Sequence, residues 1–331
     1  MIIDAHAHII VPEMTRDAAP DETWRPQVKW VNGQQVIEFG GKSLKSAVRE
    51  FVHIEAVLQA QDAAGVERVL LCPWVSLLRY DAEPQEGLRL SRIYNEALSR
   101  LAQAHPNRIS ALGTVPLQDP ELAARELETV MAGPGLHGVE IAASVNGLYL
   151  GDDRFAPFWA AAEATGALVF LHPTTRGFGM PALNDFYLWN TVGNPLETTI
   201  TAAHLIMAGV MERHRQLKVL LAHGGGAILS LRGRLQHAHS FQPQARAQLV
   251  ESPEASLRRF YFDTVTHDPT LLQALIDYAG VDHVLLGSDY PFDMGVERPA
   301  EIVRALGLPP TDEAKILGGN LVNLLKLEEN K

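Results

Sequence analysis

The sequence has a single cysteine, Cys72, among its 331 residues, which excludes an intrachain disulfide. Such low cysteine use is typical of proteins in reducing compartments, and we expect a cytoplasmic location. No apolar run approaches the ~20 residues that a membrane-spanning helix needs, so no membrane segment is expected. The first residues also lack the basic segment, apolar core and small-residue cleavage site of a secretory signal.

Positive charge is scarce. The chain has 28 Lys and Arg against 39 Asp and Glu, which gives a formal net charge of −11. This balance disfavours nucleic acids and anionic membranes as partners. A small anionic substrate remains compatible with it, provided that a local cation or a metal ion binds the substrate's negative charge.

Eight short apolar runs alternate with amphipathic helical segments along the whole chain. Runs of this kind are typical of parallel strands that are buried on both faces. They cover residues 1–8, 66–74, 108–116, 136–144, 167–173, 217–225, 260–267 and 283–291. Eight strands separated by helices predict an α/β fold of the (β/α)8 TIM-barrel type. An open doubly wound sheet is the alternative, but no GxGxxG motif follows any strand.

One region departs from this alternation. Residues ~12–48 contain QVKWVNGQQVIEF, in which Asn32-Gly33 lies between alternating residues. An Asn-Gly pair in that setting is the strongest short-range signal for a β-hairpin. We therefore expect one domain over residues 1–331, with a hairpin-bearing insertion after the first strand that covers the mouth of the barrel.

Polar side chains lie where the predicted strands end. Active sites of such barrels are at the C-terminal ends of the strands. The residues found there are His6 and His8, His172, His223 and Asp289. His6 and His8 are two apart and therefore point to the same side of a strand. Imidazole and carboxylate groups of this kind suit Zn²⁺, Mn²⁺ or Fe²⁺. Each residue could also be structural alone, for example Asp289 as a helix cap.

Four motifs carry a resemblance to a known family: DAHAHI, FLHP, LLAHGGGAI and LGSDYPF. They resemble signatures of the amidohydrolase superfamily. More narrowly, they are similar to the branch of 2-amino-3-carboxymuconate-6-semialdehyde decarboxylase and the hydroxybenzoate-type decarboxylases. The segments GTVPLQDPELAARELE and FDTVTHDPTLLQALID also look like that branch.

The resemblance implies a metal site and a base. His6, His8, His172 and Asp289 would bind one divalent ion, with Zn²⁺ expected first and Mn²⁺ as the alternative. His223 would be the catalytic base, and Asp289 would take part in catalysis as well. Relatives with two metals carry a carboxylated lysine on strand 4, whereas this strand reads GVEIAAS. Glu140 in that segment is either a group behind the metal ligands or an ordinary buried carboxylate.

The resemblance also implies an activity, a non-oxidative decarboxylation of an unsaturated or aromatic carboxylic acid. A bound divalent ion lowers the pKa of its water, and a nearby imidazole can take the proton. The resulting hydroxide would add to an electron-poor carbon of the substrate. The alternative is a hydrolase of the same superfamily that cleaves a lactone, an amide or a C–C bond. A third, non-catalytic possibility is a binding module.

An anionic substrate calls for guanidinium groups, which grip a carboxylate with two parallel hydrogen bonds. Arg234 matches the position from which the family's decarboxylase reaches into a neighbouring subunit, which implies a homodimer. Arg49, with Lys45 as the other candidate, lies near a substrate-binding arginine of the family. Arg176 stands in a loop that departs from the family pattern, and Phe292 matches an aromatic residue of the family's pocket.

Overall fold

The computed structural model describes residues 1–15, 22, 25–32, 34–39, 42–44, 48–174 and 179–327. Its main sheet has eight strands in the order β1-β5-β6-β7-β10-β11-β12-β13, and every paired neighbour along this order is parallel. The strands are β1 (Ile3–Ile9), β5 (Arg68–Pro73), β6 (Ile109–Gly113), β7 (Leu136–Ala142), β10 (Leu168–His172), β11 (Lys218–Leu221), β12 (Tyr261–Asp263) and β13 (Val284–Leu285). Each lies within one of the eight runs predicted from the sequence, apart from the last residue of β1.

The two edges of this sheet meet. The Ala5 amide donates to the Leu286 carbonyl at 2.7 Å, the His8 amide to the Tyr290 carbonyl at 2.8 Å, and the Asp289 amide to the His6 carbonyl at 2.8 Å. These bonds join the first strand to the segment that continues β13, so the sheet closes into a barrel. The predicted (β/α)8 architecture is confirmed.

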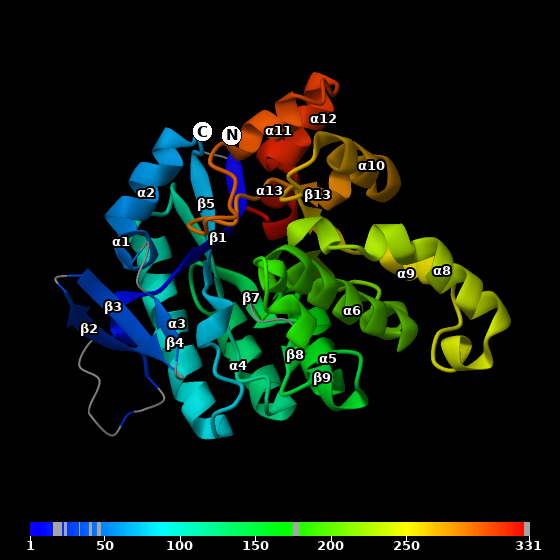
Figure 1. Ribbon diagram of the computed structural model, residues 1–331, viewed down its shortest axis with the longest axis horizontal. Helices are drawn as coiled ribbons and strands as arrows, with labels where there is room; N and C mark the ends of the chain where they lie inside the picture. Colours follow the sequence, from blue (N-terminus) through cyan, green and yellow to red (C-terminus); the bar gives the residue numbers. More distant parts are fainter. Residues whose placement is uncertain are drawn as a thin grey trace.

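Helices surround the strands (Figure 1). They are α1 (Val48–Val52), α2 (Ile54–Ala63), α3 (Pro84–Ala104), α4 (Pro120–Ala132), α5 (Ala156–Thr165), α6 (Asn194–Met207), α7 (Val210–Arg213), α8 (Ile228–Phe241), α9 (Pro253–Leu257), α10 (Pro269–Ala279), α11 (Pro299–Arg304), α12 (Pro310–Ala314) and α13 (Asn320–Leu325). Asp119 and Asp268 cap α4 and α10 by accepting backbone amides, and a proline follows each. That order is the expected chemistry of a helix start.

Shorter helical segments lie in the connections. They are η1 (Pro12–Met14), η2 (Val75–Leu77), η3 (Asp153–Phe155), η4 (Pro181–Leu183), η6 (His223–Gly225), η7 (Pro243–Arg246), η8 (Val281–His283) and the π-helices η5 (Trp189–Gly193) and η9 (Lys315–Gly319). None of the described helices combines the length and the apolar character needed to cross a bilayer.

The strands are buried because they are apolar on both faces. All seven residues of β1 are buried, including the polar Asp4, His6 and His8. A second apolar cluster packs strand residues such as Leu70 and Phe170 against α13. The Lys218 ammonium, at the start of β11, donates to the Leu324 carbonyl of α13 at 3.0 Å. The α13 helix therefore lies at the N-terminal ends of the strands and leaves their C-terminal ends free for a site.

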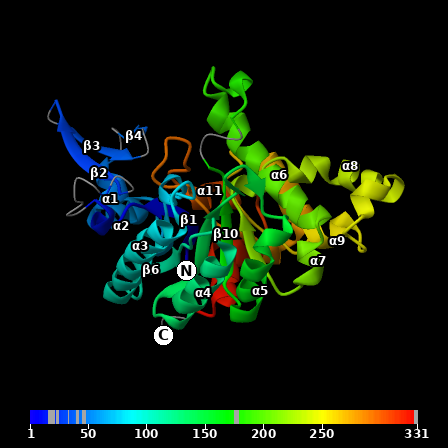
Figure 2. The same ribbon diagram turned by 90° about the horizontal axis from the view of Figure 1, so that it is seen from below.

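The insertion after β1 forms a small antiparallel sheet of β2 (Gln27–Val31), β3 (Gln34–Phe39) and β4 (Lys42–Leu44). Val31 pairs with Gln34, and Asn32 between them has a left-handed φ of 52°. The predicted hairpin is thus confirmed, with a third strand that the sequence did not indicate. The sheet projects from the barrel beside α1 (Figures 1 and 2). Its placement over the barrel mouth stays a prediction.

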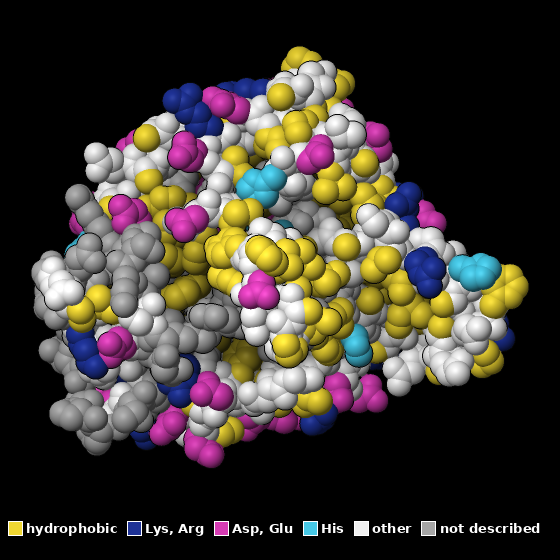
Figure 3. All heavy atoms as spheres, in the orientation of Figure 1, with side chains coloured by type: hydrophobic (Ala, Val, Ile, Leu, Met, Phe, Trp, Pro, Cys, Tyr) yellow, Lys and Arg dark blue, Asp and Glu magenta, His cyan; other side chains and the backbone are white. Residues whose placement is uncertain are grey.

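Two further segments extend from the barrel. A small hairpin of β8 (Ser144–Val145) and β9 (Leu148–Tyr149) follows β7. After β10, the chain at residues 179–193 projects from the face where the strands end (Figure 2). This projection exposes Met180, Phe186, Tyr187 and Val192. Hydrophobic side chains gather at the centre of the face shown in Figure 3.

Candidate metal centre

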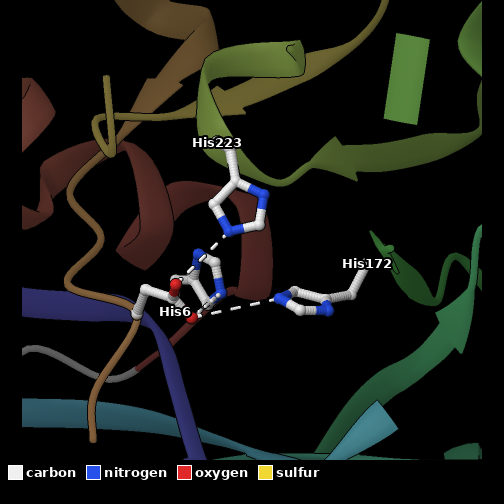
Figure 4. Close-up of side chains that lie close together, drawn as sticks. His6, His172 and His223 are labelled. Carbon is white, nitrogen blue, oxygen red and sulfur yellow. Dashed lines mark hydrogen bonds and ion pairs between the residues drawn. The ribbon is translucent and has the colours of Figure 1, made fainter. Parts of the chain in front are cut away.

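Imidazole groups from three strands converge at the C-terminal end of the barrel. His6 lies on β1, His172 ends β10 and His223 follows β11. Figure 4 shows these three side chains pointing toward a common centre. One ligand atom from each, together with a carboxylate oxygen of Asp289, lies within 4.8 Å of the others. The folded chain therefore brings together residues that are as much as 283 positions apart in sequence, from His6 to Asp289.

His8 lies beside this group. Its Nε2 atom is 3.1 Å from Nε2 of His6 and 3.5 Å from Oδ1 of Asp289. The same Asp289 oxygen is 3.2 Å from Nε2 of His6 and 3.9 Å from Nε2 of His172. Three imidazole nitrogens thus surround one carboxylate oxygen. That His6, His8, His172 and Asp289 together bind the ion stays a prediction, because the group of donor atoms within 4.8 Å of one another includes His223 and not His8.

These atoms are buried, and some have no hydrogen-bond partner. His6 and His8 are 0% exposed, His172 2% and Asp289 5%. Nε2 of His172 and Oδ1 of Asp289 have no hydrogen-bond partner among the described residues. A buried polar atom without a partner costs free energy. A divalent cation at their centre would satisfy these atoms, and imidazole and carboxylate are suitable ligands for Zn²⁺ and Mn²⁺. The residues present therefore fit a metal ion.

The rings are held by bonds at their other nitrogen. Nδ1 of His6 is 2.7 Å from Oδ2 of Asp263, and Nδ1 of His8 is 3.0 Å from the Pro73 carbonyl. Because both partners are acceptors, each Nδ1 donates its proton, and each Nε2 is left as the atom that can bind a metal ion once it carries no proton. Such outer partners fix the orientation and raise the basicity of metal-binding imidazoles.

His223 lies in a turn built from glycine. Its own φ is 55°, and Gly224, Gly225 and Gly226 have φ values of 60°, 76° and 65°. A Cβ atom on Gly226 would lie 2.1 Å from the Pro195 carbonyl oxygen. At position 226 only glycine allows the backbone to approach the Pro195 carbonyl so closely. This approach brings the turn against the start of α6.

Asp263, at the end of β12, was missed by sequence reasoning. It is fully buried. Its Oδ2 accepts the His223 amide at 2.9 Å and its Oδ1 accepts the Gly224 amide at 2.7 Å, besides the bond to His6. One carboxylate thus holds both a predicted ligand and the turn that carries the predicted base. The available signal was its position at the end of the seventh strand, FYFD.

The charges of the cluster shift its pKa values strongly. Burial lowers the pKa of His6, but the carboxylates of Asp289 and Asp263 outweigh it and raise the value to about 10. Burial opposes the same change at His8, where Glu140 and Asp289 raise the pKa to about 9. Burial and the neighbouring imidazoles hold the pKa of His172 well below its usual value. In the metal-free chain, a proton between Nε2 of His6 and Nε2 of His8, which are 3.1 Å apart, therefore supplies part of the positive charge that a metal ion would bring.

These shifts predict that metal binding depends on pH. The raised pKa values mean that the pair of His6 and His8 holds a proton at Nε2 at neutral pH, and a metal ion must displace it. We therefore expect the apparent metal affinity to rise with pH between about pH 6 and pH 9, by up to about tenfold per unit for each proton displaced. Competition against a chromophoric chelator at several pH values measures this. A flat profile would show that the cluster is not protonated in the metal-free protein.

Glu140 lies behind His8. Oε2 is 3.6 Å from Nδ1 of His8, and neither carboxylate oxygen has a hydrogen-bond partner among the described residues. Burial raises the pKa of this carboxyl group above its usual value. Of the two interpretations left open, the geometry favours a group behind the predicted ligand His8 over a hydrogen-bonded buried carboxylate.

Among the predicted substrate-binding residues, the structure describes the side chains of Phe292 and Arg234. The Phe292 ring lies 5.3 Å from the His8 ring and 5.2 Å from that of Phe51, so it borders the centre. Arg234 is exposed on α8, which projects from the barrel (Figure 2). Arg49 belongs to α1, but its side chain lies outside the described residues, as do Arg176 and Lys45.

A cavity of about 200 Å³ adjoins the centre. His223 and Asp289 lie in its wall, together with residues of η5, the start of α6, the loop after β12 and the start of α10. The cavity gives a small molecule access to the predicted base and to one predicted ligand.

The chain is similar to known proteins in both sequence and structure. A family model described as amidohydrolase matches residues 78–327. The chain is 33% identical over 254 residues to 2-amino-3-carboxymuconate-6-semialdehyde decarboxylase of Dictyostelium discoideum, which covers 76% of this chain and 70% of that protein. It is similar to the crystal structure of 5-carboxyvanillate decarboxylase from Sphingomonas paucimobilis, with 25% identity, a TM-score of 0.83 and 99% of both chains covered. A dihydroxybenzoic acid decarboxylase from a Polaromonas species, solved with bound manganese, shares the fold at 23% identity and a TM-score of 0.81, over 99% of this chain and 98% of that one.

Proposed function

The chain belongs to the amidohydrolase family, and from this premise we propose that it is a metal-dependent, non-oxidative decarboxylase of an unsaturated or aromatic carboxylic acid. The proposal is supported by the relatives, whose names are those of decarboxylases. The observation that carries it is the buried Asp289 oxygen without a hydrogen-bond partner, around which three histidine nitrogens converge.

His6, His8, His172 and Asp289 would hold one ion, either Zn²⁺ or Mn²⁺. When bound, such an ion supplies a Lewis acid that neutralises carboxylate charge and lowers the pKa of water. The outer bonds of His6 and His8 favour them as ligands, because both rings are fixed at Nδ1. Nδ1 of His223, by contrast, is buried and has no hydrogen-bond partner among the described residues.

His223 is therefore suited to carry a proton. Its Nε2 is 3.3 Å from Oδ2 of Asp289, and its side chain faces the cavity where a substrate would bind. In a decarboxylation the bond to the carboxyl carbon breaks, its electron pair stays on the substrate carbon, and that carbon takes up a proton. An imidazole that accepts a proton at one step can return it to this carbon at another. Addition of a hydroxide to the substrate stays a prediction.

The direct test is product analysis. The purified chain is loaded with Zn²⁺ or Mn²⁺ and incubated with dihydroxybenzoates, 5-carboxyvanillate and carboxymuconate-type acids, and CO₂ release is measured. We expect CO₂ from at least one acid and none from the metal-free chain. Acid release from lactones or amides without CO₂ would instead assign the hydrolase alternative. Failure to bind any divalent ion, with no activity, would revive the binding module.

We also propose that Arg234 acts in the site of a second subunit, in a homodimer. Its exposure on the projecting helix α8 supports this, because the side chain is open to a partner. Arg234→Ala should then keep its metal but lose activity. Mixing it with inactive His223→Ala subunits should restore part of the activity, since one site of the mixed dimer has both residues. A monomer by sedimentation, or a mixture that stays inactive, would contradict the proposal.

A further inference from the structure

The cavity beside the metal centre is lined by apolar side chains, such as those of Val265, Leu271 and Met294, and by neutral polar ones. Apart from His223 and Asp289, the polar side chains in its wall belong to Asn190, Thr191, Asn194, Thr266 and His267. None of the described residues that line it is Lys or Arg. A ligand in this cavity therefore meets charge at the metal centre, and both hydrogen-bonding and apolar groups on the other walls.

Asn194 stands out among these residues. It is 5% exposed, and its Oδ1 has no hydrogen-bond partner among the described residues. The equally buried Asn95 shows the ordinary situation. Its Nδ2 donates to the Thr114 carbonyl at 3.0 Å and to Glu126 at 3.1 Å, and its Oδ1 accepts the Thr114 amide at 2.7 Å. Buried amide groups are nearly always paired, so the unpaired oxygen of Asn194 calls for a partner from outside the chain.

The helical segments around Asn194 position it in the wall of the cavity. Asn194 is the first residue of α6 and directly follows the π-helix η5, which carries Asn190. Residues four apart on a helix lie on one face, and π-turns are frequent at functional sites. On the opposite side, the Ala227 amide donates to Thr199 of α6 at 2.7 Å. This bond and the close approach of Gly226 to Pro195 hold the His223 turn against the start of α6.

We propose that Asn194 determines substrate specificity by accepting, at Oδ1, a hydrogen bond from a hydroxyl group of the substrate. The inference rests on the proposed decarboxylase function and deepens it. An amide oxygen can only accept, so the matching substrate group must be a donor. The substrate's carboxylate faces the metal centre, where the positive charge lies. Ligand pockets commonly measure ~300–1,000 Å³, so this smaller cavity fits a single ring. The substrate class is a monocyclic hydroxy acid.

The test is a binding comparison. Calorimetry measures the Kd of benzoate, 2-hydroxybenzoate, 4-hydroxybenzoate and 2,6-dihydroxybenzoate for the Mn²⁺-loaded chain. If the parent converts any of these acids, the binding measurements are made in His223→Ala, which should not turn them over. The Kd of benzoate is measured in the parent and in His223→Ala to verify that the cavity still binds it in the same way. We expect at least one hydroxy acid to bind about tenfold tighter than benzoate or better, the gain for one added hydrogen bond of ~1.4 kcal/mol. In Asn194→Leu the preference should disappear while the Kd of benzoate stays within about twofold.

Stability separates this role from a structural one. Asn194→Leu removes no hydrogen bond of Oδ1, so its Tm should be unchanged or higher. Asn95→Leu breaks three bonds and should lower the Tm. Should leucine not fit, Asn194→Ala repeats the comparison. The proposal would be overturned if the parent bound benzoate and all the hydroxy acids with equal affinity, or bound none of them. It would also be overturned if Asn194→Leu lost affinity for benzoate and for the hydroxy acids to the same extent. Absence of CO₂ release with the hydroxyl preference intact would overturn only the decarboxylase function.

Discussion

Replacing His223 by alanine is expected to lower kcat by about 10²-fold or more while the protein keeps its metal, which is the range for a lost general base. The side chain lies 3.3 Å from Asp289, in the wall of the cavity, with Nδ1 unpaired. His6, His8 and His172, which surround the Asp289 oxygen, remain in place in this variant. Activity and metal occupancy should therefore separate.

The measurement combines steady-state kinetics in saturating metal with metal analysis of the dialysed protein. His237→Ala is the matched control, because His237 is exposed on α8 and its ring contacts that of Phe241 instead of the metal centre. Near-normal turnover of His223→Ala would exclude it as the base. Loss of the ion together with activity would make His223 a ligand, which its position within 4.8 Å of the other donor atoms also permits.

The sequence predicted the barrel because strand ends and strand burial are local properties. Each apolar run could be recognised alone. The rule that parallel strands end at one rim then predicted that rim as the place of His6, His8, His172, His223 and Asp289. The hairpin was predictable for the same reason, since Asn32-Gly33 determines its turn locally. Its third strand, β4, has only three residues and lacks such a signal.

What escaped prediction depends on contacts between distant segments. Asp263 lies 257 positions from His6, and nothing around it in FYFDTV distinguishes a carboxylate that orients an imidazole from an ordinary polar residue at a strand end. Likewise, three glycines follow His223 in the sequence, but only the folded chain shows that Gly226 approaches the Pro195 carbonyl. The unpaired oxygen of Asn194 is invisible in sequence, because only the folded chain shows which amides lack partners.

Replacing Asp263 by alanine is expected to have the largest effect on the protein as a whole. It removes the partner of His6 Nδ1 and the acceptor for the amides of His223, Gly224 and Val265. Breaking a buried ion pair costs roughly 3–5 kcal/mol, because the remaining charge is left without a partner. Loss of the group that orients a metal-binding histidine lowers metal affinity by about 10–100-fold. Urea unfolding and chelator competition measure the two effects.

Asp268→Ala is the matched control, since Asp268 lies in the loop that follows Asp263 and also accepts backbone amides, those of Thr270 and Leu271. It caps α10 at the surface, so its loss should cost about 1 kcal/mol and leave metal affinity unchanged. Asp263→Asn separates charge from shape, because its single amide oxygen can keep the bonds of one carboxylate oxygen, while its NH₂ group faces the donors of the other. If Asp263→Ala were as stable as Asp268→Ala and bound metal normally, the carboxylate would not be what holds the centre together.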